Sequence, residues 1–165
     1  MPLAIDMLQT PQHDIGAAVL SHPLFRGLAG ELQSRVIEGA TIREIDSQHL
    51  VFHQDKQASE LFLVLDGAVD VEIPALVGAP ALIQTLGPGS ALGWSWMFAP
   101  HRWHFDARAA VPTTLLCVDA RALRDYCDAH PAQGYELVKR VAAMMMERLD
   151  AARQRVIRLY DNPPR

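Results

Sequence analysis

The spacing of hydrophobic positions changes twice along this chain. Between Asp14 and Glu38 apolar residues recur at helical intervals, which predicts two short helices over residues 14–20 and 30–38. From about Thr41 to Val118 the period becomes two, and turn residues such as Gly67 separate short apolar or alternating runs. The runs predict strands over residues 41–45, 50–52, 61–65, 68–73, 81–86, 105–110 and 114–118. Many short, evenly spaced strands favour a closed antiparallel roll over an open α/β sheet.

The last part of the chain returns to helical spacing. Asp119 is a good N-cap for a helix that continues through Tyr126. Pro131 then opens a longer helix, which we expect to end near Tyr160 because prolines follow it.

Apolar residues in this longer helix recur with alternating gaps of four and three, which is the pattern of a helix–helix seam. Charged residues flank the seam, among them Glu147 and Arg148, which we assign to the solvent-facing sides. A helix of about 30 residues is longer than a small roll can cover at ~1.5 Å per residue. Either the helix packs only on its own domain, or an identical helix covers it across a two-fold axis, which we favour. The predicted homodimer interface consists of Val138, Ala142, Met145, Leu149, Ala152, Val156 and Leu159.

The fold class that follows is mainly β with flanking helices. It comprises an antiparallel β-roll (a jelly roll, or double-stranded β-helix), short N-terminal helices and a long C-terminal dimerisation helix. We divide the chain into an N-terminal helical lead-in (1–20), the β-roll (21–130) and the dimerisation helix (131–161).

Composition narrows the function classes. The chain has 165 residues, enough for one domain, and its net charge of −4 provides no basic surface for nucleic acid. Cys117 and Cys127 are its only cysteines and lack the spacing of a zinc site, which favours a reducing, cytoplasmic setting. We find no signal peptide and no apolar run long enough to cross a membrane.

Several segments, in this order, resemble one known family. An apolar strand ends in a polar residue and glycine at residues 60–69, a glycine-rich loop covers residues 87–93, and Met97-Phe98 and Ala107-Arg108-Ala109 follow. Together they resemble the cyclic nucleotide-binding domain of Crp/Fnr-type regulators, with the glycine-rich loop leading into its phosphate-binding cassette. The resemblance implies a ligand-sensing β-roll. Because the chain ends at Arg165, without room for the helix-turn-helix of those regulators, we expect no direct DNA binding.

Two anchors of that family are missing or displaced here. The family's cassette glycine precedes a glutamate that binds the ribose, whereas Gly93 precedes Trp94. The family's phosphate-binding arginine falls near Trp103 and His104, or at Arg102 after a shift of one residue. Loss of both anchors should weaken binding by ~4 kcal/mol, roughly a thousandfold. We therefore expect poor binding of cAMP and cGMP.

All three tryptophans, Trp94, Trp96 and Trp103, lie within a short segment, residues 89–108, that we call the cassette. They could plug the pocket, which would leave an adaptor domain that binds no ligand. They could instead stack a small planar or anionic ligand, with Arg102 or Arg108 meeting its charge. A third alternative is conventional cyclic nucleotide binding through Arg102 and backbone amides. The predicted ligand-binding residues are Gly93, Trp94, Ser95, Trp96, Arg102, Trp103, His104 and Arg108.

Other chemistries have weaker support. His101, His104 and Cys117 could be imagined as haem or metal ligands, but their spacing is no metal signature. No catalytic motif is present, and we expect no enzyme. The sequence favours a regulatory module that acts as a homodimer and signals to a protein partner.

Overall fold

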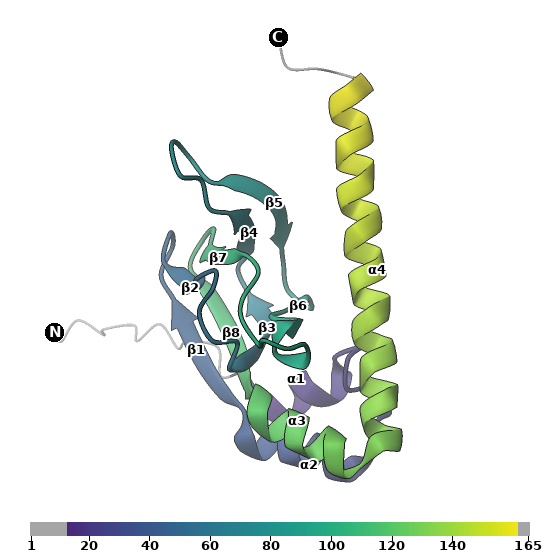
Figure 1. Ribbon diagram of the computed structural model, residues 1–165. Helices are drawn as coiled ribbons and strands as arrows, with labels where there is room; N and C mark the ends of the chain where they lie inside the picture. The colour runs from purple at the N-terminus through teal and green to yellow at the C-terminus, as the bar shows by residue number, and fades with distance from the viewer. Residues whose placement is uncertain (1–12, 162–165) are drawn as a thin grey trace, which may run out of the picture.

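The computed structural model describes residues 13–161, which form a roll of two antiparallel sheets with a long helix along its side (Figure 1). The first sheet has the strand order β1-β8-β3-β6, with β1 over Thr41–Ile45, β8 over Thr113–Asp119, β3 over Glu60–Asp66 and β6 over Ala91–Leu92. The second has the order β2-β7-β4-β5, with β2 over Leu50–Phe52, β7 over Asp106–Ala109, β4 over Val69–Ile73 and β5 over Ala81–Leu86. The predicted mainly β roll is confirmed.

The core lies between the two sheets and under the helices. Leu61, Phe62, Leu63 and Val64 in β3 are all buried, because one side of this strand faces the roll interior and the other faces helices. A strand covered on both sides has a continuous apolar sequence, whereas an edge strand alternates. In β1, which lies at the edge of its sheet, Arg43 reaches across to Glu60 with an N–O distance of 2.6 Å.

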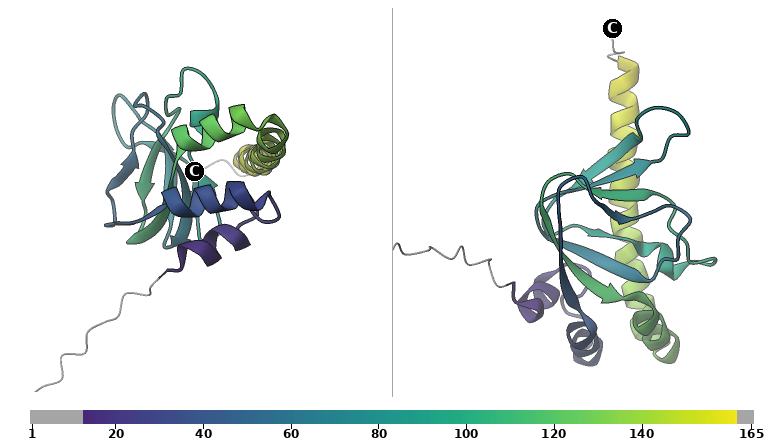
Figure 2. Two further views of the ribbon diagram at one scale, coloured as in Figure 1. Left: turned by 90° about the horizontal axis from the view of Figure 1, so that it is seen from below. Right: turned by 90° about the vertical axis from the view of Figure 1, so that its left-hand side faces the viewer.

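Three short helices gather at one end of the roll, and the β4–β5 hairpin extends at the other end (Figures 1 and 2). They are α1 (Ile15–Ser21), α2 (Gly30–Gly39) and α3 (Ala120–Ala129). The predicted cap is present, since the Asp119 carboxylate accepts a hydrogen bond from the backbone N–H of Ala122 at 2.9 Å. Asp14 caps α1 in the same way through the N–H of Ala17.

The long helix α4 spans Pro131–Asp161, as its pattern predicts. It packs on its own roll through a stripe that begins with the buried Leu137 and Val141 and continues through the partly buried Met144 and Arg148. Each of these four residues is followed directly by a residue of the predicted seam, so the seam lies on a neighbouring face of the helix. Val138, Leu149 and Val156 are 44, 63 and 52% exposed.

The helix thus has two apolar stripes side by side, one used within the chain and one open. Ala142 and Met145 are also exposed, while Ala152 is half-buried. The side chain of Leu159 lies outside the described residues. The homodimer stays a prediction, and so does the division of the chain at residues 20 and 130, whose first segment lies largely in the undescribed residues 1–12.

Candidate ligand-binding pocket

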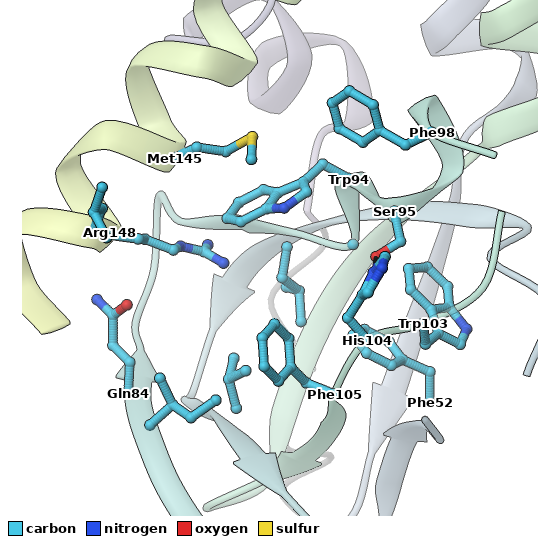
Figure 3. Close-up of a pocket in the computed structure, with 15 residues that line it drawn as sticks. Phe52, Gln84, Trp94, Ser95, Phe98, Trp103, His104, Phe105, Met145 and Arg148 are labelled. Atoms are coloured by element: carbon cyan, nitrogen blue, oxygen red, sulfur yellow. Dashed lines mark hydrogen bonds between the residues drawn. The ribbon is translucent and has the colours of Figure 1, made fainter. Parts of the chain in front are cut away.

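A cavity of about 400 Å³ opens between the roll and α4 (Figure 3). The roll provides most of its wall, and α4 closes one side with Met145, Arg148 and Leu149. The polar side chains that line it are Gln84, Ser95, His104 and Arg148. Its apolar lining residues are Phe52, Val71, Ile83, Leu92, Trp94, Phe98, Trp103, Phe105, Met145 and Leu149.

The cassette segment supplies one side of the cavity. Gly93 has a φ of +92° and precedes the short 3-10 helix η1 (Trp94–Met97), which projects the Trp94 indole over the cavity (Figure 3). A Cβ atom at Gly93 would lie 3.0 Å from a ring carbon of Trp103. Glycine is therefore required here both by the left-handed backbone and by the close approach of the Trp103 ring.

The three tryptophans occupy different environments. Trp103 is buried and stacks on Phe52, with 4.0 Å between the ring centroids. Trp96 is 1% exposed, does not line the cavity, and its Nε1 has no hydrogen-bond partner among the described residues. Trp94 is half-buried and lines the cavity. The indoles of Trp96 and Trp103 thus belong to the core, whereas the indole of Trp94 lies in the cavity wall and does not fill the cavity.

Ser95 and His104 form a polar point in the cavity wall away from α4. The Ser95 hydroxyl lies 3.1 Å from the Nδ1 atom of His104, and both side chains line the cavity. In Figure 3 they lie on the opposite side of the cavity from Arg148. A bound molecule could therefore meet hydrogen-bonding groups at two separated places.

Arg148 enters the cavity from α4. The sequence pattern assigns this residue to a solvent-facing side of the helix, and that assignment is wrong. The guanidinium carbon lies 4.1 Å from the centroid of the Trp94 ring, and Nη2 donates a hydrogen bond to the carbonyl of Ala91. Burial lowers the pKa of Arg148 to about 10, so the side chain still carries its charge at neutral pH.

The two arginines singled out from the sequence lie elsewhere. Arg108 projects from β7 between the buried Ala107 and Ala109, and strand alternation turns it away from the roll interior. Its Nε lies 3.2 Å from a carboxylate oxygen of Glu72. Arg102 is exposed and donates to the carbonyl of Asp55. Neither arginine lines the cavity, so the structure does not bring them together with Gly93, Trp94, Ser95, Trp103 and His104.

Sequence reasoning therefore missed the cation of the cavity. One signal could have found it, since Arg148 continues the helical spacing of Leu137, Val141 and Met144 and so lies on the stripe that packs on the roll. No comparable pattern in the sequence indicates that Gln84 lines the cavity. Within residues 13–161, no three His, Cys, Asp or Glu side chains gather as a metal site would require, and His101, His104 and Cys117 form no such group.

A sequence model of one protein family, described as "Cyclic nucleotide-binding domain", matches residues 42–130. The chain belongs to this family. The match spans both sheets and the cassette, as the resemblance of residues 60–69 and 87–93 implies. No curated protein matches the sequence. In the described part of the chain, no helix combines the length and the hydropathy that a bilayer span needs.

Solved structures share this fold. A cyclic nucleotide-binding domain from Methylobacillus flagellatus is 16% identical, with a TM-score of 0.72 over 86% of this chain and 82% of that one. The N-terminal domain of a transcriptional regulator from Streptomyces coelicolor is 20% identical, with a TM-score of 0.62 over 81 and 94%. The catabolite activator protein of Thermus thermophilus is 25% identical, with a TM-score of 0.63, and 84% of this chain covers 63% of its length.

Proposed function

We propose that this cyclic nucleotide-binding domain is a cytoplasmic, non-catalytic sensor that works as a homodimer through α4. A small molecule in the cavity changes the packing of α4, and a protein partner responds to that change. The observation that carries this proposal is the double position of Met145 and Leu149, which line the cavity and also belong to the exposed seam of the helix.

Because the two surfaces share these residues, a ligand that contacts them also changes the seam. Such a ligand can shift the helix arrangement only by the difference between its contacts in the two arrangements. Met145 and Leu149 can provide that difference. They are four residues apart and therefore lie on one face of α4, and Arg148 lies between them in the sequence. Coupling between such sites typically changes affinity by about 5- to 150-fold.

We also propose that cAMP and cGMP are poor ligands. None of the described residues that line the cavity carries a carboxylate to receive the ribose hydroxyl, and Arg102 and Arg108 point away from it. The lining is instead mainly apolar. This arrangement favours a compound less polar than a nucleotide.

The experiment measures the dimer dissociation constant by sedimentation equilibrium, with and without compounds that change tryptophan fluorescence. The panel contains cAMP, cGMP and common metabolites. We expect a dimer at micromolar protein, at least one compound that shifts its dissociation constant by about fivefold or more, and no cAMP binding below ~1 mM by calorimetry. A monomer at micromolar protein, or bound compounds that leave the dimer unchanged, would contradict the sensor. A cavity that binds nothing would favour the adaptor.

A further inference from the structure

We infer that the cavity binds a planar, largely apolar compound with one anionic group, and that Arg148 of α4 holds this group. The inference rests on the proposed function, because it names the class of molecule that such a sensor would detect. It differs from the family's arrangement in the place of the anion, which lies at the dimerisation helix instead of at the cassette.

The charge of the cavity supports an anion. Arg148 is the one Lys or Arg among the described lining residues, and no Asp or Glu accompanies it. A guanidinium has five N–H donors. Among the described residues, the Arg148 guanidinium forms one hydrogen bond, to the carbonyl of Ala91, and no ion pair with a carboxylate. Donors therefore remain for a bound oxyanion, with the bidentate geometry that arginine favours.

Burial of this cation without a counter-charge is unfavourable. The lowered pKa of Arg148 has desolvation as its cause. An anionic ligand would supply the missing charge at the point where water has been removed, and the attraction there is stronger than at an exposed surface. Trp94 already stabilises the guanidinium from one face, which fixes the side chain in the direction of the cavity.

The rest of the wall fits a flat apolar body. The Trp94 indole and the Phe105 ring lie on two sides of the cavity in Figure 3, and Leu92 also lines it. Aromatic rings in a cavity wall pack against planar ligands by offset stacking or by edge-to-face contact. A volume of about 400 Å³ is within the usual range of small-molecule sites. Ser95 and His104, far from Arg148, could bind a polar substituent at the other end.

The test compares two compounds of nearly the same shape, 2-naphthoate and the uncharged 2-naphthamide. Their affinities for the unmodified 165-residue chain are measured by calorimetry and by tryptophan quenching. We expect naphthoate to bind about tenfold or more tightly than naphthamide, because the oxyanion adds charge-assisted hydrogen bonds. Arg148→Met should reduce this ratio to about one, and Arg148→Lys should retain part of it.

Arg155→Met is the matched control. Arg155 lies on the same helix and donates to the carbonyl of Ile83, as Arg148 does to that of Ala91, but it does not line the cavity. This variant should keep the naphthoate preference. Circular dichroism of each variant checks that the helix is intact.

Equal affinities for the two compounds, no binding of either at ~1 mM, or a preference that survives Arg148→Met would each overturn the inference. These failures are distinct from failure of the proposed function. Naphthoate could show the Arg148-dependent preference without altering the dimer, in which case the sensor fails and the inference stands. An uncharged compound could alter the dimer while naphthoate and naphthamide bind equally well, in which case the sensor stands and the inference fails.

Discussion

Trp103 is buried and Trp94 is only half-buried, so replacement of these two cassette tryptophans should have different effects. Trp103→Ala removes a buried ring that stacks on Phe52 and touches Gly93. We expect a loss of about 3–5 kcal/mol in the free energy of unfolding, as for other buried aromatic residues. Trp94→Ala removes a half-buried ring beside a cavity and should cost about 1 kcal/mol. Urea denaturation followed by circular dichroism measures both.

The comparison decides between a structural and a ligand-facing role for each ring. Trp94→Ala should reduce the fluorescence response to cavity ligands while the fold persists, and the response that remains should come from Trp103, the other indole in the cavity wall. Similar losses of stability for the two variants would mean that Trp94 belongs to the core, contrary to this interpretation.

His22 should make stability sensitive to mild acid. Its Nδ1 accepts the backbone N–H of Leu24 at 3.1 Å and its Nε2 lies 3.0 Å from the carbonyl of Gly89, so the folded state holds the neutral ring with the proton on Nε2. Burial lowers the pKa of His22, and the hydrogen bond to Gly89 only partly opposes this. The unfolded chain therefore binds a proton more readily, and stability is lost as pH falls below ~6.5.

The melting temperature between pH 7.5 and pH 5 tests this expectation. His22→Gln should remove part of the decrease that the unmodified protein shows. His49→Gln is the control, because His49 is an exposed histidine and its removal should leave the decrease unchanged. Parallel pH curves for the unmodified protein and His22→Gln would disprove the assignment.

The sequence alone does not show which arginine side chain reaches the cavity. Arg108 is next to a family motif, yet strand alternation and Glu72 fix its side chain away from the cavity. Arg148 is 55 residues beyond Gly93, and only the docking of α4 brings it to Trp94. The sequence fixes neither this docking nor the choice between the two adjacent stripes of the helix.

Among the elements, α4 makes the clearest prediction, because its open stripe has a measurable consequence. Leu149→Asp places a carboxylate in the middle of the seam, where Leu149 is 63% exposed in the single chain. Burial of an unpaired charge at a helix interface is strongly unfavourable. We expect the dimer dissociation constant to rise by about a hundredfold or more, measured by sedimentation velocity.

Gln154→Asp is the control for this substitution. It adds the same charge to the same helix, at an exposed position on the side away from the seam. It should leave the dimer intact. Dissociation by both variants would point to a general effect on the helix, and dissociation by neither would contradict the seam.

Most elements could be predicted from the sequence, including the three-residue strand β2, but β6 and η1 could not. The Asp119 cap, the Pro131 start and the strand β5 follow from local chemistry and period. The strand β6 has two residues and η1 has four, which is too short for a hydrophobic period to show. Their place depends on the pairing of β6 with β3, a contact distant in sequence.

At the scale of the whole molecule, the cavity arises where five separate segments meet. β2, β4, β5, the cassette and α4 each contribute to its wall, and no local sequence pattern predicts the distances between them. The resemblance to the cyclic nucleotide-binding family predicted only one of these segments, the cassette, as part of the site. The spacing of Leu137, Val141, Met144 and Arg148 indicates that Arg148 lies on a packed stripe of α4, but its place beside Trp94 depends on packing over long sequence separations.

If cavity and dimer are coupled, the coupling must be reciprocal. A ligand that binds each cavity of the dimer more tightly than that of the monomer by some factor tightens the fully occupied dimer by the square of that factor. Val156→Asp allows this to be measured, since Val156 is a seam residue, 52% exposed, that does not line the cavity. We expect the resulting monomer to bind 2-naphthoate with an affinity that differs by about fivefold or more from that of the dimer. Each dimer has two cavities, so the shift of the dimer dissociation constant at saturating 2-naphthoate must equal the square of this factor. Gln154→Asp, which should remain dimeric, must bind 2-naphthoate as the unmodified protein does. Equal affinities of the Val156→Asp monomer and the unmodified dimer would mean that the cavity and the seam act independently, although Met145 and Leu149 belong to both.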